Sequence, residues 1–187
     1  MSYIIGIDLG GTKINAVLIN KSGKIIRKVK TILKRKDKNY VLEELSNSVS
    51  LVSSGIKKNQ ILGVGIGMPG PFSIDRKKTV KLPNLPSLSN LNLQEILQKK
   101  FKMKVKVEND AKCAVLGEFF FSRRKEKNMV LLTLGTGLGG GIIIDGKLYL
   151  GKGNAGEIGH TTIQSNGLLC HCGNSGQQPS APREQRR

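Results

Sequence analysis

Short apolar runs, separated by turn residues, open the chain. The runs are Tyr3 to Asp8, Ile14 to Ile19 and Lys24 to Lys30. Gly10-Gly11-Thr12-Lys13 separates the first two, and Asn20-Lys21-Ser22-Gly23 separates the last two. Runs of this length between turn residues are typical of strands. We therefore predict a three-stranded meander, whose first turn holds more glycine than a simple hairpin requires.

A helical pattern follows the meander. From Tyr40 to Ile56 the apolar residues recur at spacings of three and four, which predicts a helix with one buried face. Ile61 to Ile66 then has the pattern of a short strand. It ends in Gly67-Met68-Pro69-Gly70-Pro71, whose two prolines exclude a helix or a central strand. We expect a crossover helix, a strand and a rigid loop at the strand end.

The order of helix and strand then repeats. Leu93 to Phe101 has helical spacing, and Val105 to Val107 alternates like a strand. Asn109-Asp110 can cap a third helix, which we expect to run to about Phe121. The residues predicted on its apolar face are Cys113, Leu116 and Phe120.

Two further strands are predicted, from Met129 to Leu134 and from Gly141 to Ile144. Asp145-Gly146 is a hairpin signal that leads to Lys147-Leu148-Tyr149. Strands and helices thus alternate as in an α/β fold. After Gly176 the chain is polar and has no periodicity, so we expect residues 177–187 to be disordered.

Composition narrows the class of protein. Hydrophobic residues make up 38% of the chain, and glycines interrupt its longest apolar stretch, around Met129 to Ile144. No run approaches the roughly twenty apolar residues of a membrane helix. The N-terminus has neither a basic leader nor a small-residue cleavage site, so we expect a cytoplasmic protein without a membrane partner. The chain has three cysteines, Cys113, Cys170 and Cys172. An odd number suits a reducing compartment better than a disulfide framework.

The chain is strongly basic. It has 31 lysines and arginines against 13 acidic residues, which gives a formal net charge of +18. Such a charge makes nucleic acid a candidate partner. The basic residues are scattered along the chain with little aromatic interleaving, which favours solvated lysine-rich faces instead. We do not expect a nucleic-acid partner.

Two glycine-rich segments lie between predicted strands. In the first, Asp8 to Lys13, backbone N–H groups can turn towards an anion while Asp8 faces a metal ion. The second runs from Leu134 to Gly141. A simple glycine turn explains either segment taken alone. Two of them together indicate a triphosphate that is held from both sides of a cleft.

Five motifs in this order resemble the ROK family of sugar kinases and regulators, within the hexokinase and actin-like fold. They are Asp8 to Lys13, Gly65 to Pro71, Glu108 to Ala111 with Gly117-Glu118 following, Leu134 to Gly141, and Ala155 to His160. The resemblance covers Tyr3 to Gly176. It implies an actin-like/hexokinase (ribonuclease H-like) α/β fold, with the N-terminal lobe in residues 1–121 and the beginning of the C-terminal lobe in residues 122–176.

The resemblance also implies a role for each motif. The residues expected at the phosphates of ATP and its magnesium are Asp8, Gly10, Gly11, Thr12, Lys13, Gly135, Thr136, Gly137 and Gly139. Those expected at the sugar are Gly70, Asn109, Asp110, Glu157 and His160. Asp110 matches the family's catalytic base, a carboxylate that accepts the proton of the sugar hydroxyl. Taken alone, Asp110 is explained equally well as a helix N-cap.

A structural zinc site of the family is only partly matched. His160, Cys170 and Cys172 resemble three of its ligands. The family's next cysteine is replaced by Gln177, and a sugar-binding glutamate by Pro179. A tetrahedral structural zinc requires four protein ligands, so the set is incomplete and zinc binding stays open. Because the resemblance stops abruptly at Gly176, we expect a frameshift or a truncation there.

The function implied is that of an ATP-dependent sugar kinase, which transfers the γ-phosphate of ATP to a hexose hydroxyl. Glucose is the expected substrate, although the motifs do not separate it from other hexoses. The alternative is the sugar-sensing effector domain of a ROK-type transcriptional regulator. Such regulators carry a helix-turn-helix region before the first phosphate motif, and only seven residues precede Asp8, which favours the kinase.

A third hypothesis is a fragment that lacks its second lobe and exposes apolar surface where that lobe should pack. For the 187 residues alone we expect weak or absent activity and a tendency to aggregate. The resemblance implies a homo-oligomer for the full-length protein.

Overall fold

The computed structural model describes residues 1–122, 125–135, 137–169 and 173–175. They form two compact units, of which the first is Met1–Asp110 and the second begins at Ala111. Each unit has its own sheet. The predicted tail, residues 177–187, lies outside the described residues.

The first unit is built on a five-stranded sheet. Its strands are β1 (Tyr3–Leu9), β2 (Lys13–Asn20), β3 (Ile25–Ile32), β4 (Ile61–Met68) and β5 (Val105–Asn109), in the order β3-β2-β1-β4-β5. β1, β2 and β3 pair antiparallel, so the predicted meander is confirmed. β4 and β5 join the meander in parallel, β4 beside β1 and β5 beside β4. β4 continues two residues beyond the predicted strand and takes in Gly67 and Met68.

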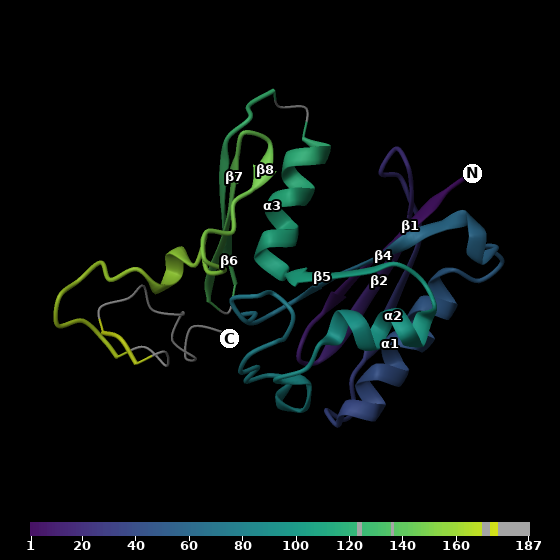
Figure 1. Ribbon diagram of the computed structural model, residues 1–187, viewed down its shortest axis with the longest axis horizontal. Coiled ribbons are helices and arrows are strands. Elements are labelled where there is room, and N and C mark those ends of the chain that lie inside the picture. The colour runs from purple at the N-terminus through teal and green to yellow at the C-terminus, as the bar shows by residue number, and fades with distance from the viewer. Residues whose placement is uncertain (123–124, 136, 170–172, 176–187) are drawn as a thin grey trace, which may run out of the picture. The chain divides into compact units, whose positions relative to one another are not determined.

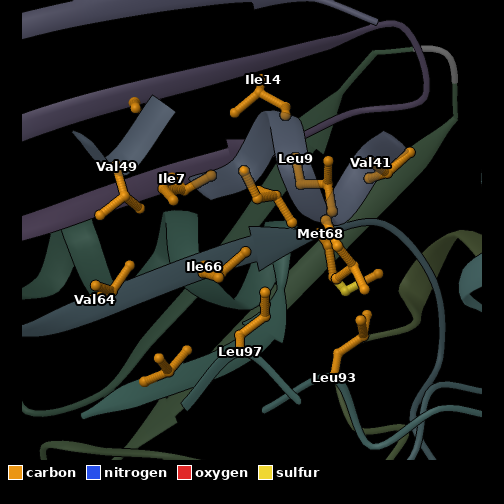
Figure 2. Close-up of a cluster of buried hydrophobic side chains, with 14 of the residues drawn as sticks. Ile7, Leu9, Ile14, Val41, Val49, Val64, Ile66, Met68, Leu93 and Leu97 are labelled. Carbon is orange, nitrogen blue, oxygen red and sulfur yellow. The ribbon is translucent and has the colours of Figure 1, made fainter. Parts of the chain in front are cut away.

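Two helices supply the other half of the core. They are α1 (Lys38–Val52) and α2 (Leu93–Phe101), which pack against the sheet and touch each other (Figure 1). Alternate residues of β1, β2 and β4 face them, and Figure 2 shows this cluster. The helices start at capping residues, because Asp37 accepts a hydrogen bond from the Tyr40 N–H at 3.0 Å and Asn92 accepts one from the Glu95 N–H at 3.2 Å.

The second unit combines a helix with a small antiparallel sheet. Its elements are α3 (Asp110–Phe121), β6 (Met129–Leu134), β7 (Leu138–Ile144), β8 (Lys147–Leu148) and the 3-10 turn η3 (Ile158–His160). β7 is the central strand, with β6 and β8 on either side. β7 begins at Leu138 and not at Gly141, so Gly139 and Gly140 belong to the strand and the connecting turn is shorter than predicted.

Glycines of β7 allow α3 to lie close against the sheet. A side chain at Gly139 would stand 3.1 Å from Ala111 Cβ, and one at Gly141 would stand 2.4 Å from Val115 Cγ1. Contact this close requires glycine on the strand. The helix therefore turns Ala111 and Val115 inward.

The predicted apolar face of α3 was wrong. Ala111, Lys112 and Val115 are buried, whereas Phe120 is 68% exposed and Cys113 and Leu116 are only half-buried. The physical reason is the close approach of β7, whose glycines accept small and branched side chains of α3 and leave no space for larger ones. Lys112 is buried beside them because its ammonium donates to the Gly153 carbonyl at 2.8 Å.

None of the helices in the described residues is long and apolar enough to span a bilayer.

Substitutions at two glycines should separate close packing from helix propensity. We expect Gly141→Ala to lower the free energy of unfolding by about 1–3 kcal/mol, because the new methyl group overlaps Val115. Gly117→Ala is the matched control within α3, where an added Cβ meets nothing within 4 Å. It should raise stability by up to about 1 kcal/mol. Denaturant unfolding of both variants measures the difference, and equal stabilities would contradict the packing described here.

Candidate active site

Three strands end together at one edge of the first sheet. β1, β4 and β5 are parallel, and the pairing sets Asp8 beside Gly67 and Gly67 beside Glu108. One position further, Met68 pairs with Asn109. The segments that follow these strands therefore leave the same edge of the sheet. This edge is where open α/β sheets bind their ligands.

The first of these segments is the glycine loop between β1 and β2. The Gly10 N–H donates to the Lys13 carbonyl at 2.9 Å, which closes the turn. The Leu33 N–H donates to the Thr12 carbonyl at 2.9 Å and ties the loop to the chain after β3. Gly10 and Gly11 are half-buried, and Thr12 and Lys13 are exposed.

Asp8 is exposed at the end of β1 and has a fixed orientation. Its Oδ2 accepts a hydrogen bond from Asn15 Nδ2 at 3.0 Å, across the β1–β2 pair. Its neighbour on the other side, Gly67, has no side chain, so the carboxylate faces open space on the sheet edge. A carboxylate presented in this way is a suitable ligand for Mg²⁺.

The loop after β4 packs tightly around Gly70. This glycine has φ +107°, in the region that favours glycine, and a side chain there would stand 2.2 Å from Leu82 Cδ2. A small cavity of about 30 Å³ lies among Pro69, Gly70 and residues 82–85. In the same segment, a side chain at Gly11 would stand 2.8 Å from Asn84 Cβ. Residues 82–85 thus pack against both the Gly10–Lys13 loop and the Gly70 loop.

Asp110 follows β5 directly. It is the first residue of α3 and is exposed, while Asn109 is the last residue of β5 and is half-buried. The predicted capping pair is therefore divided between a strand and a helix. A carboxylate in the first helical turn is favoured by the helix dipole. The Asn109 N–H donates to Glu108 Oε1 at 2.7 Å, which fixes the backbone just before Asp110.

The second unit holds the other predicted phosphate residues. The turn between β6 and β7 is closed by the Gly135 N–H, which donates to the Gly137 carbonyl at 3.0 Å. Both glycines are exposed, and Thr136 lies outside the described residues. Gly139 pairs with Thr133 within the sheet, and a side chain there would stand 2.6 Å from Thr133 Oγ1.

Glu157 and His160 sit at the two ends of η3. The His160 N–H donates to the Glu157 carbonyl at 3.0 Å, so the two residues are one helical turn apart. Close contacts hold this turn on β7. A side chain at Gly159 would stand 2.2 Å from the Leu138 carbonyl, and one at Gly140 would stand 2.5 Å from the Gly156 carbonyl. β7 thus packs α3 on one face and the Glu157 segment on the other.

The zinc hypothesis stays a prediction. Cys170 and Cys172 lie outside the described residues, and His160 is exposed. In the part of the chain that the structure describes, no three His, Cys, Asp or Glu side chains gather as a metal site.

An ion pair just before Asp110 in the chain was not predicted from the sequence. The Arg76 guanidinium forms an ion pair with Glu108, two residues before Asp110. The alternation of β5 could have indicated that Glu108 faces away from the core. Val105 and Val107 point inward, so Lys106 and Glu108 share the opposite face of the strand. The partner Arg76 comes from a loop 32 residues away, which no local pattern indicates.

The fold belongs to the actin-like, hexokinase class of α/β proteins. The structure superposes on the ROK family glucokinase of Streptomyces griseus, solved with glucose and AMPPNP, with a TM-score of 0.79 at 34% identity. That match covers 94% of this chain and 55% of the glucokinase chain.

Family membership follows from the sequence comparison. The ROK family model matches residues 4–177, so the chain belongs to the ROK family. It is 40% identical over 178 residues to a glucokinase of Thermotoga maritima, covering 92% of this chain and 55% of that protein. It is also 40% identical over 181 residues to a xylose repressor of Caldicellulosiruptor bescii, covering 92% of this chain and 44% of the repressor. The chain thus spans about half the length of these relatives.

Proposed function

We propose that the protein of which these residues form part is an ATP-dependent sugar kinase. The observation that carries the proposal is the common sheet edge. There Asp8 lies at the end of β1, and the Gly10–Lys13 loop, Gly70 and Asp110 follow the parallel strands β1, β4 and β5. We propose that the first unit thereby supplies both the phosphate cradle and the carboxylate base. The similarity to glucokinases of Thermotoga maritima and Streptomyces griseus supports a hexose as the acceptor, with glucose as our first choice.

The glycine loop suits a nucleotide phosphate. Its backbone approaches Asn84 so closely at Gly11 that any side chain there would displace the neighbouring segment. Lys13 is exposed at the end of the loop and can meet phosphate oxygens with its ammonium group. Asp8 would hold Mg²⁺, which when bound neutralises phosphate charge. We propose the Gly135–Gly139 segment of the second unit as a further phosphate contact.

Asp110 would act on the acceptor sugar. Its carboxylate accepts the proton of the sugar hydroxyl while that oxygen forms a bond to the γ-phosphorus. The bond between this phosphorus and the bridging oxygen breaks, and ADP leaves with the electron pair. Asn109, Glu157 and His160 are proposed to hydrogen-bond other sugar hydroxyls, and Gly70 to bring its backbone against the ring.

A second candidate is the effector domain of a sugar-responsive regulator. The specific observation in its favour is the 40% identity to a xylose repressor, equal to the identity to a glucokinase. Both functions require sugar binding, but only the kinase requires a base and a phosphate loop. Phosphoryl transfer therefore separates the two.

Asp110→Asn tests the base. We expect the turnover of the intact protein with glucose and MgATP to fall by about 10²–10⁴-fold, because the amide cannot accept the proton. ATP affinity should change less than about twofold, since the proposed phosphate contacts lie elsewhere. Turnover is followed by coupled detection of ADP and ATP binding by calorimetry. Substantial remaining turnover would refute the role of Asp110.

Two adjacent glycines test the phosphate loop. In Gly11→Ala the new methyl group stands 2.8 Å from Asn84 Cβ, whereas in Gly10→Ala it stands 3.5 Å from the Lys13 carbonyl, an ordinary contact. We expect the first variant to lose about tenfold or more in ATP affinity and the second to stay within about threefold. Calorimetric titration with MgATP measures both. A larger loss at Gly10 than at Gly11 would contradict the proposed cradle.

A further inference from the structure

A short hairpin follows the Gly70 loop. Phe72 and Thr79 form its bridge, and the Ser73 N–H donates to the Lys78 carbonyl at 2.8 Å. The Arg76 N–H donates to the Ser73 carbonyl at 2.8 Å, which closes the turn. The Ser73 hydroxyl, which donates to Asp75 at 2.6 Å, and the Lys77 N–H together lower the pKa of Asp75 below its usual value. The turn is therefore internally well bonded.

Arg76 occupies a backbone conformation that other residues fit better. Its φ is +60°, and the left-handed position that ends such a hairpin turn is usually glycine or asparagine. A bulky residue in this conformation carries strain, and strain of this kind collects where a side chain is needed in one place. The contacts of the Arg76 side chain show what that place is.

The Arg76 guanidinium connects the hairpin to the end of β5. It is paired with the Glu108 carboxylate and lies over the Phe72 ring, with 4.9 Å between the guanidinium carbon and the ring centroid. Glu108 Oε1 also accepts the Asn109 N–H at 2.7 Å. One carboxylate thus bonds both the hairpin that follows Gly70 and the backbone that precedes Asp110.

Burial distinguishes this ion pair from the others described. The Arg76 and Glu108 side chains are 23% and 20% exposed. The pair between Lys99 and Glu95 on α2 is 78% and 54% exposed, as expected for a surface pair of little consequence. Partial burial strengthens the pair that adjoins Asp110, because water screens it less.

We propose that Arg76 and Glu108 are positioning residues for phosphoryl transfer. They lock the hairpin of residues 72–79 to the end of β5, so that the Gly70 loop and the Asp110 carboxylate keep one relative placement. This inference rests on the proposed kinase function and adds two residues to its machinery.

Kinetics of the intact protein test the positioning role. Arg76→Asn removes the guanidinium and suits the left-handed backbone, and Glu108→Gln keeps an acceptor for the Asn109 N–H but removes the charge. We expect each to lower kcat for glucose by about tenfold or more, with the KM for ATP changed less than about threefold. Lys99→Gln and Glu95→Gln are matched controls and should leave kcat unchanged. An unchanged kcat in both test variants would overturn the proposal.

Limited proteolysis tests whether Glu108 holds the hairpin, and it does not depend on measuring kinase turnover. Lys77 and Lys78 are trypsin sites in the hairpin, and their cleavage reports its release from Glu108. We expect Glu108→Gln to speed cleavage there several-fold and Glu95→Gln to have no effect. Equal cleavage rates in the two variants would overturn the lock. If the unaltered protein shows no turnover, the proposed function fails while the proteolysis result still decides whether Glu108 holds the hairpin.

Discussion

Parallel pairing of β1, β4 and β5 is the constraint on which the candidate site depends. Residues that are about a hundred positions apart in the chain, such as Asp8 and Glu108, become neighbours across Gly67 because the strands run in the same direction and end together. The core behind them sets this register. Leu9, Ile66 and Met68 are buried under α1 and α2, and a slip of one residue would turn these side chains to the opposite face.

Glycine performs a different task in each unit. In the first unit, Gly11 and Gly70 have no side chain, so their loops can pack closely against residues 82–85 at the sheet edge. In the second unit Gly139, Gly140 and Gly141 let α3 and the Glu157 segment approach β7 from its two faces. Glycine-rich runs that look like phosphate loops in the sequence can therefore be packing surfaces as well.

Local patterns predicted most of the elements but not how side chains meet. The meander, α1, α2 and β5 follow from periodicity and turn residues, which are local properties of the chain. The inward face of α3 could not be predicted from local periodicity, because it is set by glycines of β7 that lie more than twenty residues later. Asp8 was singled out from its glycine-rich turn, and Gly70 and Asp110 from the family resemblance. The contact of Arg76 with Glu108 depends on a hairpin geometry that no motif encodes.

Backbone NMR of the isotopically labelled intact protein, titrated with glucose and MgATP, is the most direct test of the central claim. We expect the largest amide shift changes in Gly10 to Lys13, at Gly70 and at Asn109-Asp110, at the carboxyl ends of the three parallel strands. Changes that gather instead at the opposite end of β4, around the cavity lined by Ser46, Lys58 and Lys100, would contradict it.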